Sequence, residues 1–261
     1  PCTYCAARMY NQLYDEAGAG EYGRRRSHDN VLAELHALRA AGRLGYVIFL
    51  DDTFTINHGW VREFCRRYGE ELHAPFSLHA RVETVNEKML HMLAAAGCQM
   101  ITYGVESGSE RVRREIMDRQ VTNQRFKDVF QWTRDAGILL TCNFMLGLPD
   151  ETRDDLQQTL DLAEELGVHD FGYFVFYPYP GTALFKVCQE RGYLPADYLT
   201  RPANHRQSIL TLPGLSQDDI GEYFDRFTAL RRRMYLARTG TLPPEEQHGA
   251  YDHVDRLAAT G

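Results

Sequence analysis

The sequence has fewer basic than acidic residues and no long apolar segment. Its 261 residues include 29 Lys and Arg against 36 Asp and Glu, a formal net charge of −7. This diffuse acidic balance argues against a general nucleic-acid binder, which needs a basic face. No apolar stretch reaches the roughly 18 residues that suggest a membrane-spanning helix. We therefore predict neither a nucleic-acid partner nor a membrane span.

Cysteine is scarce and mostly isolated. Of the six cysteines, only Cys2 and Cys5 lie close together. A secreted disulfide framework usually has denser cysteines in a shorter chain, so the pattern predicts a protein of the reducing cytoplasm. No signal-peptide core follows the first residue, which is Pro1 and not Met. We expect a fragment whose true N-terminus lies upstream.

Short apolar runs alternate with amphipathic helical patterns along the chain. Runs of this kind, bounded by polar residues, Gly or Pro, are typical of buried parallel strands. The alternation predicts βαβ units and a parallel sheet. No GxGxxG follows any run, so a dinucleotide fold loses support, and polar residues gather after the runs as they do in (β/α) barrels. The predicted strands cover residues 46–50, 76–82, 100–105, 139–146 and 171–176.

The tetrapeptide Cys2-Thr3-Tyr4-Cys5 has three chemical readings. It could be half of a zinc site, a redox dithiol, or part of an iron–sulfur loop. No second CxxC or HxxxH supports zinc, and the context does not fit a thioredoxin-like domain. The remaining interpretation is a loop that binds an iron–sulfur cluster and precedes a parallel barrel.

Five further motifs follow this loop in order. They are FLDDTF at 49–54, GVESGS at 104–109, MDRQVT at 117–122, GLPDET at 147–152 and YPYPGTALF at 177–185. Together with CTYC they resemble the core of the radical SAM superfamily, most closely the subgroup that carries a cobalamin-binding domain. The family motif is Cx3Cx-aromatic-C, so its first cysteine would lie three positions before Pro1, after an upstream first strand.

The resemblance implies a fold and a domain division. We expect an α/β fold, a partial (β/α)6 TIM-type barrel without its first strand, over residues 1–192. A mostly helical extension would follow over 193–261. Within the strand at 139–146, side chains alternate, so Thr141, Asn143 and Met145 should face the barrel interior.

The resemblance also implies two cofactors. Cys2 and Cys5 would bind irons of a [4Fe–4S] cluster, beside the aromatic Tyr4, with one iron left open for S-adenosylmethionine (SAM). For the methionyl ammonium of SAM, we expect Asp51 and Asp52, which could instead be helix caps.

The remaining SAM-binding residues are also predicted from the resemblance. Arg119 and Arg81 would bind the methionyl carboxylate through a guanidinium fork, unless they are surface or structurally paired arginines. Asn143 would bind the ribose, because a polar side chain in a buried strand needs a partner. Glu106 and Ser107 would contact the cofactor, unless they cap the helix that follows.

Two further segments complete the predicted site. Gly147-Leu148-Pro149 would let the backbone approach adenine, or would form a plain turn. Tyr177 is predicted to lie at the cofactor, and with Tyr179 it would line the substrate mouth, although plain packing explains both equally well.

The implied activity is formation of a 5′-deoxyadenosyl radical, used for methyl transfer with an upstream cobalamin domain. A radical rearrangement or cyclisation without methylation is the alternative, and so is a binding scaffold that has lost its cluster. A zinc-stabilised binding module is a further reading. The expected partners are a small, natural-product-like substrate and an electron donor such as ferredoxin or flavodoxin. The sequence does not name the substrate.

Overall fold

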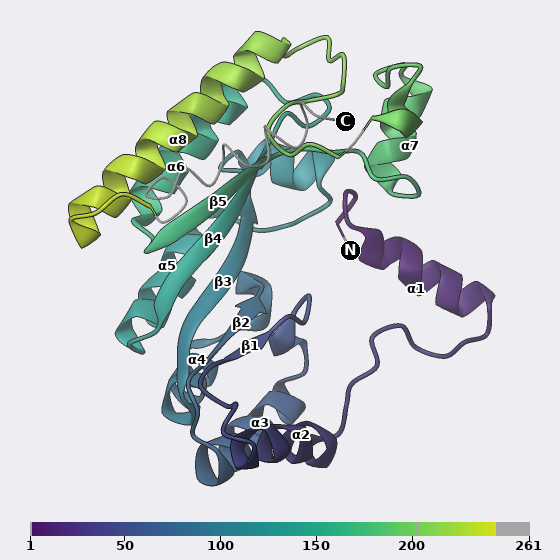
Figure 1. The fold of residues 1–261 in the computed structure, drawn as a ribbon. Coiled ribbons are helices and arrows are strands. Elements are labelled where there is room, and N and C mark those ends of the chain that lie inside the picture. Colours follow the sequence, from purple (N-terminus) through teal and green to yellow (C-terminus); the bar gives the residue numbers. More distant parts are fainter. Residues whose placement is uncertain (1, 202, 244–261) are drawn as a thin grey trace.

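The computed structural model describes residues 2–201 and 203–243, and its centre is an open parallel sheet (Figure 1). The five strands lie in chain order, β1-β2-β3-β4-β5, and every neighbouring pair is parallel. The strands are β1 (Val47–Phe49), β2 (Phe76–Ala80), β3 (Cys98–Glu106), β4 (Leu139–Leu146) and β5 (Asp170–Val175). The predicted α/β fold with a parallel, barrel-type sheet is confirmed.

Helices follow the strands as the alternating pattern predicts. Each long helix that follows a strand begins with an Asn, Ser or Thr whose side chain accepts a backbone N–H of the first turn, as Asn86 does from Met89. The helices are α1 (Ala6–Glu16), α2 (His28–Ala40), α3 (His58–Glu71), α4 (Glu87–Ala96), α5 (Asn123–Asp135), α6 (Arg153–Leu166), α7 (Ala183–Glu190) and α8 (Gln217–Thr239). No helix in the described part of the chain is long and apolar enough to cross a bilayer.

The two faces of the sheet differ. Along β4, Cys142, Phe144 and Leu146 are fully buried, and the Phe144 ring packs 5.7 Å from that of Phe227 in α8. The alternate residues Thr141, Asn143 and Met145 are only partly buried. One face of the sheet is therefore covered by helices, and the other, which we call the open face, carries Asn143 as predicted.

Several predicted boundaries need correction. Strand β1 covers only residues 47–49, β2 ends at Ala80, and β3 begins earlier than predicted, at Cys98, and ends at Glu106. Helix α1 was not predicted, and it lies apart from the sheet and its helix layer (Figure 1). After β3 the chain forms a five-residue π-helix, Val112–Ile116, in place of a regular helix.

The C-terminal part packs onto the last strand. Helix α8 contacts α6 and β5, and the backbone N–H of Val175 donates to the carbonyl of His205 at 2.7 Å. The division at residue 192 stays a prediction, and residues 244–261 of the predicted extension lie outside the described residues.

Candidate active site

The Cys2–Cys5 loop is attached to two other segments. The backbone N–H of Thr3 donates to Met117 at 3.1 Å, and its hydroxyl donates to Ile116 at 2.6 Å. Its carbonyl accepts from Leu184 of α7 at 3.0 Å. The loop is therefore held beside the segment that leads to Arg119.

Cys2 and Cys5 are the two thiols of this loop. Neither is in a disulfide, and Cys5 caps α1 by accepting the N–H of Ala7 at 3.4 Å. The other four cysteines are buried in the core, where burial raises the pKa of Cys65 and Cys98 to about 12. Within the described ranges, no three His, Cys, Asp or Glu side chains form a metal-binding group. The loop thus carries two cysteine thiols that are free of disulfides.

Glu106 ends β3 in an unusual conformation. The pairing with β4 shifts between Gly104 and Glu106, and the φ angle of Glu106 is 73°. Bulges and left-handed residues of this kind concentrate at functional sites, where they re-aim a side chain. The carboxylate folds back over Gly104, since a Cβ there would lie 2.5 Å from Glu106 Oε1. Only glycine at position 104 leaves room for it.

Tyr4, Cys2 and Glu106 form one electrostatic group. Burial raises the pKa of Glu106, opposed by Arg119, by a hydrogen bond from Tyr4 and by Arg81. Burial also raises the pKa of Tyr4, and Glu106 and Cys2 raise it further. Glu106 and Cys2 thus disfavour ionisation of the Tyr4 phenol.

Arg119 is buried and paired with Glu83. Its Nε and Nη2 donate to the two carboxylate oxygens of Glu83, both at 2.9 Å, and Nη1 donates to the carbonyl of Gly104 at 2.7 Å. Arg81 binds the same carboxylate at 2.6 Å. Burial opposes ionisation of Glu83, but the bonds and charges of Arg119 and Arg81 outweigh it and hold its pKa at about 2.

The structure pairs both arginines within the protein, and their contact with SAM stays a prediction. The carboxylate that occupies their forks in the structure is Glu83, which the sequence reasoning missed. The Arg-x-Glu spacing of Arg81 and Glu83 was the available signal for an ion pair. The second partner, Arg119, lies 36 residues beyond Glu83, where no local pattern points to it.

Asn143 lies on the open face between two glycines. Its register partners are Gly104 on β3 and Gly172 on β5. A Cβ at Gly172 would lie 2.7 Å from Asn143 Oδ1. Among these three residues only Asn143 carries a side chain, and the Glu106, Asn143 and Phe174 side chains cover the two glycines.

Asp51 and Asp52 are exposed just after β1. They do not cap α3, because Asn57 does so by accepting the N–H of Trp60 at 2.9 Å. Their carboxylates are therefore not used by the helix that follows.

Ser107 does not reach the site. It follows Glu106 directly, so the alternation of the strand turns it to the helix-covered side, where it is fully buried. Its hydroxyl lies 3.1 Å from that of Thr159 in α6. The neighbouring Ser109 donates to Asp155 at 2.6 Å.

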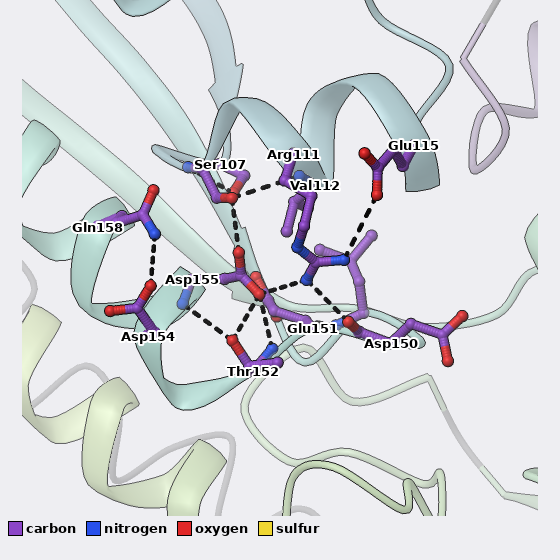
Figure 2. A network of polar contacts seen from close by, with 12 residues as sticks. Ser107, Arg111, Val112, Glu115, Asp150, Glu151, Thr152, Asp154, Asp155 and Gln158 are labelled. Atoms are coloured by element: carbon purple, nitrogen blue, oxygen red, sulfur yellow. Dashed lines mark hydrogen bonds and ion pairs between the residues drawn. The ribbon is translucent and has the colours of Figure 1, made fainter.

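The GLPDET segment is also turned away from the open face. The N–H groups of Gly147 and Leu148 donate to Glu151 Oε2 at 2.7 and 3.0 Å, and a Cβ at Gly147 would meet Ile220 of α8. Asp155 joins this segment to the GVESGS segment, since it accepts from Thr152 at 2.7 Å and pairs with Arg111 (Figure 2). Gly147, Leu148 and Pro149 are buried, and their approach to adenine stays a prediction.

Tyr177 lines a cavity of about 300 Å³ next to the cluster loop. Tyr4 and Met145 share the wall of this cavity with it. The structure thus brings together most of the predicted residues: Cys2, Tyr4, Cys5, Arg81, Glu106, Arg119, Asn143 and Tyr177.

Comparison with known families identifies the family to which the chain belongs. The sequence profile of the Radical SAM superfamily matches residues 1–163. The chain belongs to the radical SAM superfamily. Members of this superfamily bind a [4Fe–4S] cluster and SAM, and the matched range includes the cysteine loop, Glu106, Arg119 and Asn143.

Relatives of this radical SAM chain include methyltransferases. An uncharacterized methyltransferase of Pyrococcus horikoshii is 29% identical over 186 residues, which are 71% of this chain and 39% of that protein. The cytidylyl-2-hydroxyethylphosphonate methyltransferase of Streptomyces wedmorensis is 26% identical over 247 residues, 90% of this chain and 45% of that one.

A solved structure supports the radical SAM fold. OxsB, a cobalamin-dependent S-adenosylmethionine radical enzyme with aqua-cobalamin and SAM bound, superposes with a TM-score of 0.62 at 16% identity. The match covers 90% of this chain and 42% of OxsB. The chain therefore spans less than half of the length of each of these proteins.

Proposed function

We propose that this chain is the cofactor-binding core of a radical SAM enzyme that transfers a methyl group to a small molecule with the help of cobalamin. Its similarity to methyltransferases supports the reaction class. Radical rearrangement or cyclisation without methylation is the alternative within the same superfamily.

The row formed by Gly104, Asn143 and Gly172 is the observation that carries the proposal. Gly104 and Gly172 flank Asn143, and a side chain at either glycine would collide with Glu106 or Asn143. The glycines thus let an amide and a carboxylate lie against the backbone on the open face, where both could be hydrogen-bond partners of a ligand. The sugar and the amino acid portion of SAM need partners of these kinds.

The donor set also fits the cofactors. Cys2 and Cys5 would bind irons of the cluster, and Asn143 and Glu106 would bind hydroxyl groups of SAM. Arg119 has five N–H donors and makes four hydrogen bonds, to Glu83, Gly104 and Val105, so it would bind the SAM carboxylate through the remaining donor. Asp51 and Asp52 would accept from the ammonium. Bound cluster and SAM supply one-electron chemistry, while the protein supplies binding and orientation.

The whole protein would need partners beyond this chain. A reductant such as ferredoxin or flavodoxin would donate electrons to the cluster. A reducing cytoplasm would keep the cysteine thiols reduced and able to bind iron. A cobalamin-binding domain outside residues 1–192 would receive the methyl group.

Asn143→Leu tests the SAM site. Leucine nearly conserves the volume, so we expect the thermal unfolding temperature to stay within a few degrees of wild type. SAM affinity, measured by calorimetry on protein loaded with iron and sulfide, should fall about tenfold, the effect of a lost hydrogen bond of about 1.5 kcal/mol. A stable variant with wild-type SAM affinity would show that Asn143 does not serve the cofactor.

A further inference from the structure

Arg113 is a fully buried arginine that the proposed function does not use. Its side chain is 0% exposed, and it lies in the π-helix that precedes the turn with Arg119. The carboxylate of Glu110 is 4.0 Å away, but its side chain is 46% exposed and it accepts the N–H of Asn123. Burying a charge is costly unless a close partner compensates it. Fold stability alone therefore does not account for an arginine at this position.

The Arg113 guanidinium donates to three acceptors that lie on both sides of the Arg119 turn in the sequence. Nη1 donates to the carbonyl of Ser107, just after β3. Nε donates to the carbonyl of Val121 at 3.1 Å, and Nη2 donates to Asn123 Oδ1 at 2.6 Å. The guanidinium thus ties the end of β3 to the residues that follow Arg119.

The turn that carries Arg119 has an unusual backbone. Asp118 has a φ angle of 53°, and the π-helix before it is a form that occurs frequently at functional sites. Residues in such conformations persist only where the surrounding structure holds them. The N–H of Arg119 donates to the carbonyl of Arg113 at 2.8 Å, so Arg113 holds this turn by its backbone as well as by its side chain.

The ring of Phe126 is a partner that the two arginines share. The Arg113 guanidinium lies 5.0 Å from the centroid of this fully buried ring, and the Arg119 guanidinium lies 5.5 Å from it. The attraction between a cation and an aromatic face is stronger when both are desolvated. A displacement of Arg113 would therefore disturb both the ring and the backbone against which Arg119 rests.

We propose that Arg113 is a positioning residue, which holds the turn so that the Arg119 guanidinium meets Glu83. The binding of SAM by Arg119 rests on the proposed function, but the effect of Arg113 on the Arg119–Glu83 pair is a property of the chain alone. Lysine cannot replace Arg113, because an ammonium group lacks the rigid planar fork that reaches several acceptors in fixed directions.

The pKa of Glu83 reports the position of Arg119 without any cofactor. It is measured from the carbon NMR signal of the side-chain carboxyl, which is assigned by its loss in Glu83→Gln. Arg113→Lys keeps the positive charge, because even a buried lysine is protonated over the acid range of this titration. We expect the pKa of Glu83 to rise from about 2 in wild type to about 3 or higher in Arg113→Lys, since a displaced Arg119 stabilises the carboxylate less.

Two further variants separate position from charge and from stability. Arg113→Met removes the charge as well as the fork. Leu230→Ala removes a buried side chain of α8, which packs on β5 and α6, so it should lower the unfolding temperature and leave the pKa of Glu83 as in wild type. An unchanged pKa of Glu83 in Arg113→Lys would overturn the proposal, even if Arg113→Met raises it, because charge at a distance would then be the cause. Equal shifts in Arg113→Lys and Leu230→Ala would also overturn it.

Asn123→Ala is a milder variant that decides the question if Arg113→Lys does not fold. It keeps Arg113 and removes one of its three acceptors. The pKa of Glu83 should rise in this variant too, by less than in Arg113→Lys. A pKa of Glu83 equal to that of wild type would then overturn the proposal.

SAM affinity separates this proposal from the proposed function. Calorimetry on protein loaded with iron and sulfide should show about tenfold weaker SAM binding in Arg113→Lys than in wild type. If wild type binds no SAM while the pKa of Glu83 shifts as expected, the proposed function fails and the positioning role of Arg113 stands. If wild type binds SAM while the pKa of Glu83 is the same in Arg113→Lys, the positioning role fails and the proposed function stands.

Discussion

Glu83 holds two arginine side chains of the candidate site in place through its carboxylate. Its carboxylate is bound by Arg119, which is 3% exposed, and by Arg81. Removing one partner of a buried pair leaves the other charge uncompensated, which is more costly than the net gain of the pair. We therefore regard Glu83 as the residue that positions the Arg119 guanidinium beside Glu106 and Tyr4.

The Glu83 pair predicts a specific acid dependence. Its pKa falls from 4.5 to about 2 on folding, so its stabilisation is present above pH 4.5 and is lost as pH falls toward 2. Between pH 5.5 and 3, wild type should lose roughly 2 kcal/mol more unfolding free energy than Glu83→Gln, from the linkage of roughly 1.4 kcal/mol per pKa unit. Urea unfolding at both pH values measures this, and identical losses would disprove the pairing.

Glu151 predicts a pH dependence of stability opposite in sign to that of Glu83. Burial raises its pKa from 4.5 to about 8, despite its two backbone N–H bonds, and its Oε1 has no partner among the described residues. Its contribution is fully present below pH 4.5 and is lost as pH rises through 8. Glu151→Gln should therefore flatten the decline in stability between pH 5 and 8. Asp154→Asn, an exposed neighbour, should leave the decline as in wild type.

At the scale of elements, the end of β3 places Glu106 and Ser107 on opposite faces of the sheet. Glu106 turns to the open face and Ser107 to α6, because successive strand residues point to opposite sides. The two glycines that flank this turn serve different purposes. Gly104 makes room for the Glu106 side chain, whereas Gly108 lets β3 approach the α6 backbone, since a Cβ there would lie 2.3 Å from the carbonyl of Gln158.

Substitution of these two glycines by alanine should therefore affect different properties, stability at Gly108 and SAM affinity at Gly104. Gly108→Ala forces a backbone shift and should destabilise the fold by about 1–3 kcal/mol or more, as overpacking does. Gly104→Ala displaces only the flexible end of Glu106, so stability should change little while SAM affinity falls. Paired thermal unfolding and SAM titration distinguish them, and a strong loss of stability in Gly104→Ala would refute the assignment.

The sequence predicts elements better than it predicts contacts. Within the described residues, the apolar runs located all five strands, because this signal is local. Helix α1 escaped notice because none of its residues is buried. The open-face position of Asn143 followed from strand alternation, and the same rule applied to Ser107 would have turned it away from Glu106.

Contacts between segments that are distant in the sequence could not be predicted from local patterns. The Glu83–Arg119 pair and the contact of His205 with β5 depend on tertiary packing. So does the bond network between the GVESGS and GLPDET segments, which share Asp155 (Figure 2). These motifs are adjacent in space, and hydrogen bonds through Asp155 join them.

At the scale of the molecule, the described chain is an open sheet with one face covered by helices and a thiol loop attached near the other. The family identity and the open face together imply a cluster and SAM. Three cysteine ligands hold a cluster of this kind in the family motif, and the loop in this sequence contains two. The central claim is therefore that Cys2 and Cys5 become cluster ligands once a third thiolate stands at the motif position.

Iron content measures that claim most directly. The tripeptide Cys-Ala-Ala placed before Pro1 completes the family spacing, and Ser-Ala-Ala placed there is the matched control. After anaerobic reconstitution, the cysteine version should hold about four irons per chain, with an electron paramagnetic resonance signal that SAM alters. The serine version, and the cysteine version with Cys2→Ala or Cys5→Ala, should hold far less iron. Equal iron in all four proteins, or a cluster signal that SAM leaves unchanged, would contradict the account.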